Sequence, residues 1–254
     1  MQVNIRVTPD TVALNHAVAQ WWLTLSKQAI QSKGGFYVAL AGGSTPRALY
    51  EMLSQPPYCD SVDWPNVHIY FGDERSVPLD HVDSNYRMAH AALLSKVAIP
   101  EQNIHPIHTN TADMEGSAEH YESVLQSTIA LKSQDIPCFD LILLGMGDDG
   151  HTASLFPDTS ILKEKTKLVA PVFVEKLNTW RVSLTYPVIN KAKQVAIVVA
   201  GEAKADKLYE IFVAQSKVNP IEQINPDGIL IWYLDTAAAT RLPSAIINNT
   251  SMAG

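Results

Sequence analysis

The sequence contains little cysteine and no excess of positive charge, and each shortage excludes a class of protein. Its two cysteines, Cys59 and Cys138, are too few and too far apart for a disulfide framework or a zinc site, and they fit a reducing compartment. The 26 acidic and 19 basic side chains give a net charge of −7. Proteins that bind nucleic acid by neutralising its phosphates are normally basic, so we expect no nucleic-acid partner.

Long hydrophobic runs are also missing. The longest apolar stretches, residues 141–144 and 195–200, are far shorter than the ~20 residues that a membrane-spanning helix needs. The opening residues MQVNIRVTPD lack the basic start and apolar stretch of a signal peptide. We therefore expect a cytoplasmic protein without a membrane partner, and we leave its oligomeric state open with a monomer favoured.

The composition of the 254 residues is typical of a globular protein, with 46 % hydrophobic and 18 % charged side chains. This length allows one large domain or two small ones. Short apolar runs, rich in β-branched residues, alternate with longer amphipathic stretches. We expect strands at residues 3–7, 36–41, 67–71, 139–144, 195–200 and 229–234, and helices at 11–33, 46–54, 84–97, 113–132 and 203–215.

Two of these helices have recognisable starts. Pro46 suits the first helical position, and Asp83 is a plausible N-cap for the helix that follows it. Strands separated by helices need crossover connections, which make a sheet mostly parallel with helices on both faces. The pattern predicts an α/β protein: a single three-layer α/β/α domain, residues 1–254, around a Rossmann-like sheet. Such sheets bind ligands beyond the carboxyl ends of their strands.

The first group of unusual residues at an expected strand end is AGGSTPR, residues 41–47. Gly42 and Gly43 let the backbone approach a ligand closely. Ser44 and Thr45 offer hydroxyls, and the helix N-terminus adds unpaired N–H groups. Together they predict a phosphate-binding loop, although the same residues also suit a tight turn with an ordinary cap. No Gly-Lys-Ser/Thr follows, so this is not a Walker motif.

The second group, GDER at residues 72–75, follows the expected strand 67–71 directly. It brings together Asp73, Glu74 and Arg75, and charged groups are costly to bury without partners. One interpretation is a solvated loop that contains an Asp/Arg pair. The position at the carboxyl end of a strand favours a functional role instead.

The third group, GMGDDGHT at residues 145–152, contains G-x-G-x-x-G but is not a dinucleotide fingerprint. Pro157 prevents a long helix from starting there, and the motif lies in the middle of the chain. The glycines are better suited to hold Asp148, Asp149 and His151 at the edge of the sheet. Histidine is the side chain best suited to proton transfer near neutral pH, so we expect a catalytic role.

Two separate cations complete the set of candidates. Arg181 lies in RVSLT, and Lys204 lies in GEAKA just beyond the expected strand 195–200. Either side chain would serve to close over a phosphate. Each alone is an ordinary surface cation, so this signal depends on the other three groups.

In this order the motifs resemble the 6-phosphogluconolactonase family, which is grouped with the glucosamine-6-phosphate isomerases. The combination of GDER with GHTASLFP is specific, whereas AGGSTP is shared with related sugar-phosphate enzymes. The resemblance covers most of the chain, in the segments LAGGSTPRALYEML (40–53), YFGDERSVPLDHVDSNYRMA (70–89), FDLILLGMGDDGHTASLFP (139–157), RVSLTYPVINKA (181–192), VVAGEAKA (198–205) and IWYLDTAAA (231–239).

Membership of this family implies hydrolysis of 6-phospho-D-glucono-1,5-lactone to 6-phosphogluconate, the second step of the oxidative pentose phosphate pathway. It also implies a fold related to those of glucosamine-6-phosphate deaminases and ribose-5-phosphate isomerase. The resemblance implies neither a metal nor an organic cofactor.

The resemblance and the chemistry of ester hydrolysis assign the same roles, because the reaction needs an activated water and a stabilised oxyanion. His151 is the expected general base, and either Asp148 or Asp149 would orient its imidazole. Arg75 would stabilise the oxyanion or hold a substrate hydroxyl, with Asp73 fixing its position. The substrate phosphate would bind to Gly42, Gly43, Ser44 and Thr45, capped by Arg181 and Lys204.

Three alternatives stay open. Ser154 would be a rival nucleophile, although its neighbours lack the G-x-S-x-G pattern. A glucosamine-6-phosphate deaminase would resemble D-E-Y and GHIAFNEP where this chain has DER and GHTASLFP. A non-catalytic sugar-phosphate sensor would usually carry a DNA-binding module, and the sequence shows neither a helix-turn-helix extension nor a basic face.

Overall fold

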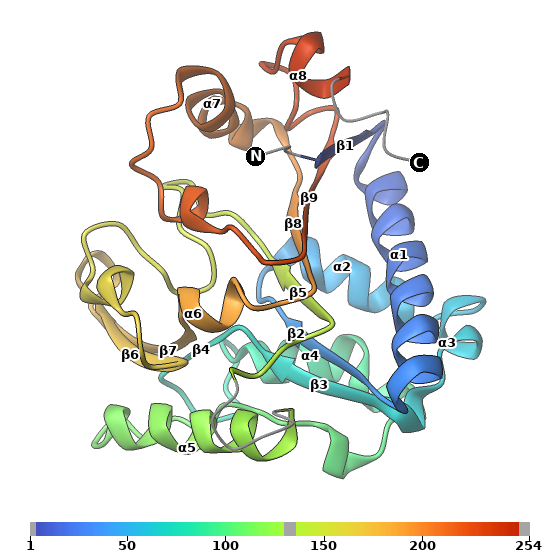
Figure 1. Cartoon of the computed structure of the whole chain (residues 1–254), viewed down its shortest axis with the longest axis vertical. Coiled ribbons are helices and arrows are strands. Elements are labelled where there is room, and N and C mark those ends of the chain that lie inside the picture. Colours follow the sequence, from blue (N-terminus) through green and yellow to red (C-terminus); the bar gives the residue numbers. More distant parts are fainter. Residues whose placement is uncertain (1–3, 130–135, 249–254) are drawn as a thin grey trace.

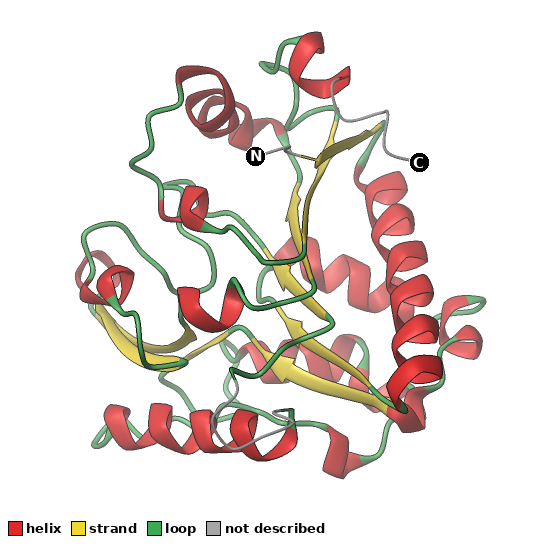
Figure 2. Cartoon of the chain, in the orientation of Figure 1, coloured by secondary structure: helices red, strands yellow, loops and turns green. Residues whose placement is uncertain are grey.

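The computed structural model describes residues 4–129 and 136–248. A six-stranded sheet runs through it, and every strand pairing in this sheet is parallel (Figure 2). From one edge to the other, the strands are β1 (Asn4–Thr8), β9 (Ile229–Asp235), β8 (Gln194–Val199), β5 (Leu141–Leu144), β2 (Phe36–Leu40) and β3 (Val67–Phe71). The prediction of an α/β protein with a mostly parallel sheet is confirmed, with strand ends shifted by at most two residues from those expected.

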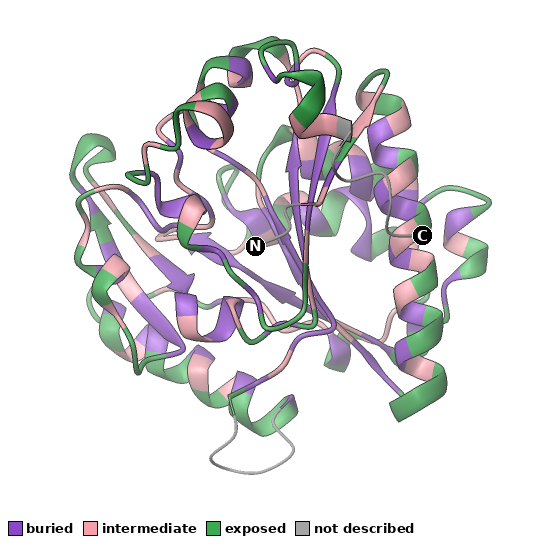
Figure 3. Ribbon diagram, turned by 45° about the horizontal axis from the view of Figure 1, so that its top comes forward, coloured by how far each residue is buried: buried purple, intermediate pink, exposed green. Residues whose placement is uncertain are grey.

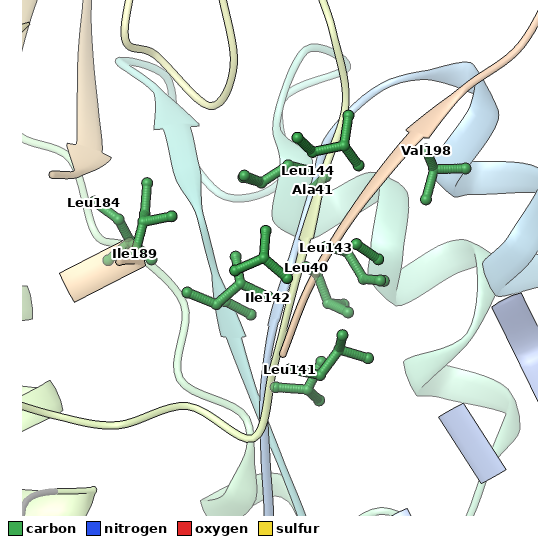
Figure 4. Close-up of a cluster of buried hydrophobic side chains, with 14 of the residues drawn as sticks. Leu40, Ala41, Leu141, Ile142, Leu143, Leu144, Leu184, Ile189 and Val198 are labelled. Carbon is green, nitrogen blue, oxygen red and sulfur yellow. The ribbon is translucent and has the colours of Figure 1, made fainter. Parts of the chain in front are cut away.

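Most strands of this sheet are apolar on both faces because both faces are covered, whereas the edge strand β1 is only partly buried. All four residues of β5 are buried, and their side chains extend to both sides of the strand (Figure 4). Helices α1 (Thr11–Lys33) and α2 (Ser44–Leu53) lie on one side of the sheet, and α6 (Tyr186–Ile189) lies on the other (Figure 1). The buried residues therefore concentrate along the sheet, between two outer layers (Figure 3).

Two of the predicted helix starts are wrong, because nearby residues provide the capping geometry. Helix α2 begins at Ser44 rather than Pro46, and Gly43, with a φ of 106°, turns the chain into it. Helix α4 (Asn85–Ala92) is capped by Ser84 rather than Asp83, since the Ser84 side chain accepts the N–H of Arg87 at 3.1 Å.

Three predicted helices are shorter than expected. Residues 84–97 form α4 and a separate 3-10 turn. Of residues 113–132, the helix α5 takes Met114–Thr128, and 130–132 lie outside the described residues. Residues 203–215 divide into a 3-10 turn (Glu202–Lys204), α7 (Ala205–Tyr209) and a π-helical turn (Glu210–Ala214). Three short helices were not predicted, namely α3 (Tyr58–Ser61), α6 (Tyr186–Ile189) and α8 (Ser244–Asn248). Within residues 4–129 and 136–248, no helix is both long enough and apolar enough to cross a membrane.

A second, antiparallel sheet lies beside the main one, and the sequence analysis did not predict it. Its strands are β4 (Asp73–Arg75), β7 (Thr179–Leu184) and β6 (Val169–Val174), with β7 in the centre. Helix α5 packs against β6 and β7 (Figure 1). Apolar runs reveal only part of this sheet. Strand β6 is apolar throughout, but β4 consists of three charged residues and the first half of β7 is partly exposed.

The strand order creates a crevice between β2 and β5. After β2 the chain forms β3 on one side, and after β5 it forms β8 and β9 on the other side. The loops that leave β2 and β5 therefore diverge at the carboxyl ends of these strands, where open α/β sheets bind ligands. These loops contain the AGGSTPR and GMGDDGHT segments, and β4 of the small sheet follows β3 after one residue.

Candidate active site

A cavity of about 380 Å³ lies at the carboxyl ends of β2, β5 and β8, beside the small sheet. Asp148 and Asp149 do not line it, although His151 of the same loop does. Nine of the eleven residues predicted for the site line this cavity, namely Gly42, Gly43, Ser44, Thr45, Asp73, Arg75, His151, Arg181 and Lys204. The fold thus brings together four groups of residues that are far apart in the sequence.

His151 is held by neighbours on three sides. Its Nδ1 lies 2.5 Å from Asp149 Oδ1, and its ring stacks on Phe156 with the centroids 4.0 Å apart. A Cβ atom added at Gly147 would lie 2.0 Å from the imidazole, so glycine at this position leaves room for the ring. Because Asp149 occupies Nδ1, Nε2 is the ring nitrogen left for a ligand in the cavity.

The two neighbouring aspartates have different partners. Asp149 also accepts the backbone N–H of His151 at 3.1 Å and forms an ion pair with Lys176. Although burial raises the pKa of Asp149, the hydrogen bonds from Lys176 and His151 lower it to about 2. Asp148 is 87 % exposed and forms an ion pair with Lys204. The carboxylate in contact with the imidazole is therefore that of Asp149.

Tyr50 fixes the turn between β2 and α2. Its buried hydroxyl accepts the N–H of Ala41 at 2.9 Å and donates to the carbonyl of the same residue at 2.8 Å. The next residue, Gly42, packs tightly against Asn85, because a Cβ atom at Gly42 would lie 2.0 Å from Asn85 Oδ1. These contacts set the path of the backbone where it enters the cavity.

The same turn ends in the N-terminus of α2. The φ of 106° at Gly43 is one that other residues rarely adopt, and it directs the chain into the helix. Ser44 and Thr45 form the first helical residues and line the cavity. The first N–H groups of a helix have no partner within it and carry partial positive charge, so this wall of the cavity suits an anion.

Three cations also line the cavity. Arg75 and Arg181 are paired in register on β4 and β7, and Lys204 follows β8. Burial and the charge of Arg75 lower the pKa of Arg181. Arg75 donates from Nη1 to the carbonyl of Asp83 at 2.7 Å, and Arg181 donates to that of Trp180 at 3.3 Å. Two guanidinium groups side by side repel each other, and a bound anion would relieve this repulsion.

Asp73 is buried beside the cavity but does not hold Arg75. It accepts hydrogen bonds from Ser154 Oγ at 2.6 Å and from Asn85 Nδ2 at 3.1 Å. The expectation that Asp73 fixes the position of Arg75 is wrong, because these two donors satisfy its carboxylate and the Asp83 carbonyl holds the guanidinium. Asp73 instead joins the small sheet to α4 and to the loop that follows β5.

The surroundings of Ser154 do not suit a nucleophile. Its side chain is buried and donates to Asp73, and its backbone N–H donates to Ser183 Oγ at 3.1 Å. Among the described residues, no hydrogen bond joins this hydroxyl to His151. A serine nucleophile needs a base at its hydroxyl, so the geometry favours attack by water.

Glu74 shows that GDER is not a solvated loop. Its side chain is fully buried and accepts hydrogen bonds from Ser84 Oγ and from the backbone N–H groups of Arg75, Asn85 and Tyr86, at 2.7 to 3.0 Å. Burial raises the pKa of Glu74 despite these N–H donors. Its carboxyl group lies at the N-terminus of α4, where negative charge is favourable, and ties β4 to that helix.

The sequence analysis did not identify two residues of the small sheet that lie near His151. Leu177 lines the cavity, and Lys176 contacts Asp149, which lies 27 residues earlier in the chain. Both belong to a 3-10 turn, Glu175–Leu177, between β6 and β7. No local pattern marks them, since a lysine beside a leucine in a surface turn is ordinary.

No group of three or more His, Cys, Asp or Glu side chains in the described part of the chain is arranged to hold a metal ion. The resemblance likewise implied no metal and no organic cofactor. A reaction without either group stays a prediction.

Comparison with known proteins identifies the family. The family model for glucosamine-6-phosphate isomerases/6-phosphogluconolactonase matches residues 9–232. A 6-phosphogluconolactonase from Synechocystis is 44 % identical over 217 residues, which are 85 % of this chain and 88 % of that protein. One from Nostoc is 40 % identical over 244 residues, 95 % of this chain and 99 % of that protein.

A solved structure agrees with these sequence matches. The structure of the 6-phosphogluconolactonase from Trypanosoma cruzi is 29 % identical to this chain, with a TM-score of 0.84. The match covers 94 % of this chain and 97 % of that one. The resemblance found in the motifs is thus confirmed, and the chain belongs to the glucosamine-6-phosphate isomerase/6-phosphogluconolactonase family.

Proposed function

We propose that this protein is a carboxylic ester hydrolase that converts 6-phospho-D-glucono-1,5-lactone to 6-phosphogluconate in the oxidative pentose phosphate pathway. The observation that carries the proposal is the pairing of His151 with Asp149 beside a cavity lined by three cations. A base that activates water and a site for a phosphate would then lie in one cavity. Relatives named 6-phosphogluconolactonase, at 44 % and 40 % identity, support the same reaction.

His151 acts as the general base in this proposal. Nε2 takes a proton from a water molecule while the water oxygen attacks the lactone carbonyl carbon, which gives a tetrahedral oxyanion. Asp149 keeps the other proton on Nδ1 and stabilises the imidazolium that forms. The imidazolium then returns its proton to the ring oxygen as the ring C–O bond breaks. The product is the open-chain acid, and the imidazole is neutral again.

The three cations of the cavity would bind two different parts of the substrate, the lactone group and the phosphate. Arg75 would stabilise the oxyanion or hold a substrate hydroxyl. The phosphate would lie against the N–H groups of Ser44 and Thr45 at the N-terminus of α2, with Gly42 and Gly43 allowing its approach. Arg181 and Lys204 would close over it by charge-assisted hydrogen bonds. Lys204 would exchange the exposed carboxylate of Asp148 for the phosphate.

We also propose that residues 1–254 form a single domain and that the protein is a cytoplasmic monomer without nucleic-acid or membrane partners. Light scattering at micromolar concentration tests the monomer. A single cooperative unfolding transition, coincident by two spectroscopic probes, tests the single domain.

The direct test is hydrolysis of the lactone, generated from glucose 6-phosphate by its dehydrogenase and followed as 6-phosphogluconate appears. Because this lactone also opens unaided, the rate above the enzyme-free blank is the measure, and it should rise in proportion to protein concentration. Release of ammonia from glucosamine 6-phosphate at a comparable rate would favour a deaminase. Tight binding of sugar phosphates with no turnover would favour a sensor.

A further inference from the structure

The hairpin between β6 and β7 extends from the small sheet to the loop that holds His151. At its tip, Leu177 lines the cavity and Lys176 forms an ion pair with Asp149. The ammonium of Lys176 also lies 4.8 Å from the ring centroid of Phe156. Because Asp149 and Phe156 are the two side chains that hold the imidazole of His151, Lys176 contacts both of its supports.

The backbone of this tip is built as a closed turn. Asn178 has a left-handed conformation, with a φ of 47°, and its N–H donates to the carbonyl of Glu175 at 3.0 Å. Behind the turn, Phe173 and Trp180 are cross-strand partners whose rings lie 5.3 Å apart. The backbone of Lys176 is therefore held by the hairpin, and its half-exposed side chain reaches Asp149 from there.

Lys176 acts on Asp149 from the side opposite the imidazole. His151 contacts Oδ1 of the carboxylate, and Lys176 contacts Oδ2. A carboxylate held at both oxygens cannot rotate away from the ring, and its charge is shared between two cationic partners once the imidazole is protonated.

The other charged groups near His151 belong to different contacts. Asp148 lies on the same loop and is paired with Lys204. The small sheet contributes Asp73, which is bonded to Ser154 and Asn85, and the two arginines Arg75 and Arg181. Among the described residues, Lys176 is the lysine or arginine that forms an ion pair with Asp149.

We propose that Lys176 is a positioning residue: it fixes the carboxylate of Asp149 and thereby the imidazole of His151. This assignment rests on the proposed lactonase function, in which His151 is the base. It makes the small sheet part of the machinery of proton transfer as well as of the anion site.

Replacement of Lys176 by methionine tests the assignment, with Lys176→Arg as the conservative variant. Lys167→Met is the matched control, because Lys167 is also a half-exposed lysine paired with one carboxylate, Glu115, outside the cavity. For K176M we expect kcat to fall about three- to fivefold, the loss expected for a partly exposed ion pair, with KM nearly unchanged. K176R should recover most of the activity, and K167M should behave as the parent.

The pH–rate profile separates positioning from a structural role. Loss of the cation leaves Asp149 to interact with His151 alone, which favours the protonated imidazole. The acid limb of the K176M profile should therefore move to higher pH, by at least about half a pH unit, the shift expected for charges ~6 Å apart screened as strongly as in bulk water. In K176R the acid limb of the pH–rate profile should return to its wild-type position. A fall in kcat without this movement, or a rise in KM alone, would overturn the assignment.

A double-mutant cycle tests whether Lys176 acts through Asp149. In an Asp149→Asn background, K176M should change kcat less than twofold, because the carboxylate it fixes is gone. The full loss in that background would show that Lys176 acts elsewhere. NMR titration of the His151 imidazole without substrate gives a readout that does not need the reaction. If the wild-type protein hydrolyses no lactone, the proposed function is wrong. If the His151 imidazole titrates identically in the wild type and in K176M, the proposed role of Lys176 is wrong.

Discussion

The two sheets contribute to the cavity by different means. The main sheet contributes through the loops that follow β2 and β5, which place helix N–H groups, hydroxyls and the imidazole of His151. The small sheet contributes the charged side chains of Asp73, Arg75 and Arg181 from β4 and β7, and Leu177 from the β6–β7 tip, where Lys176 contacts Asp149.

The loops of the main sheet and the side chains of the small sheet are positioned by different physical features. The loops of the main sheet depend on close packing, with glycine at positions where a Cβ atom would collide with a neighbour and with Tyr50 bridging the turn. The side chains of the small sheet depend on strand register, which sets Arg75 opposite Arg181. Changes in the loop after β5, which holds His151, should therefore affect chemistry. Changes in the turn after β2, or at Arg181 and Lys204, should affect anion binding.

The largest expected effect comes from His151→Asn, which removes the proposed base from a main-sheet loop. General-base catalysis typically contributes about 10²–10⁴-fold, so kcat should fall by that much. Binding of 6-phosphogluconate, measured by calorimetry, should weaken only a few-fold because the anion site is formed by other segments. Near-normal turnover would make His151 structural. Equal losses of turnover and binding would break the division between the base and the anion site.

The next largest effect concerns the cations at the proposed phosphate site. Charge-assisted contacts are worth roughly 1.5–3 kcal/mol, so Arg181→Ala or Lys204→Ala should lower kcat/KM for the phosphorylated lactone by about ten- to a hundredfold. Unphosphorylated gluconolactone should be a poor substrate for the wild type and should lose little more. Arg87→Ala, on the exposed part of α4, is the control. Equal losses for both lactones would remove these cations from the phosphate site.

A smaller effect is expected from Tyr50→Phe, which removes the hydroxyl that bridges the N–H and carbonyl of Ala41. A buried N–H left without a partner costs about 1–3 kcal/mol, so the urea midpoint should fall without a change in m. Phosphate-dependent binding should weaken several-fold while the pH–rate profile stays in place. Tyr209→Phe, at an exposed site on α7, should leave stability unchanged. An unaltered midpoint for Tyr50→Phe would show that the turn does not depend on this hydroxyl.

The smallest effect concerns acid stability of the main sheet, where His105 stacks on Tyr70 with centroids 4.4 Å apart. Burial and the neighbouring His68 lower the pKa of His105 to about 4. The folded protein therefore holds the imidazole of His105 neutral. Because the pKa of this histidine is ~6.5 in the unfolded chain, the free energy of unfolding should decrease as the pH falls from ~6.5 toward about 4.

His105→Phe tests this, because phenylalanine keeps the stacking and cannot titrate. Its Tm should fall less than that of the wild type between pH 7.5 and 4.5, by calorimetry in matched buffers. The variant also separates acid loss of the fold from acid loss of catalysis at His151. Parallel Tm profiles in the two proteins would contradict the role of His105.

The sequence alone indicated the main sheet and much of the cavity. Apolar residues marked all six strands, and the strands inside the sheet are apolar throughout because a parallel strand there is buried on both faces; this pattern is local. The segments AGGSTPR and GMGDDGHT were visible for the same reason, since glycines and a helix start act over a few residues. Crossover connections make the strands parallel, which places both segments at the carboxyl edge, but the order of the strands was not predicted.

Only the tertiary structure revealed the small sheet and the partners of the charged groups. Asp148 and Asp149 are adjacent and identical in type, and what separates them is Lys204 and Lys176, which approach from different elements. Likewise, DER forms a buried strand because β7, α4 and Ser154 supply its hydrogen bonds. Such pairings depend on contacts between segments far apart in the chain, and no local periodicity or cap encodes them.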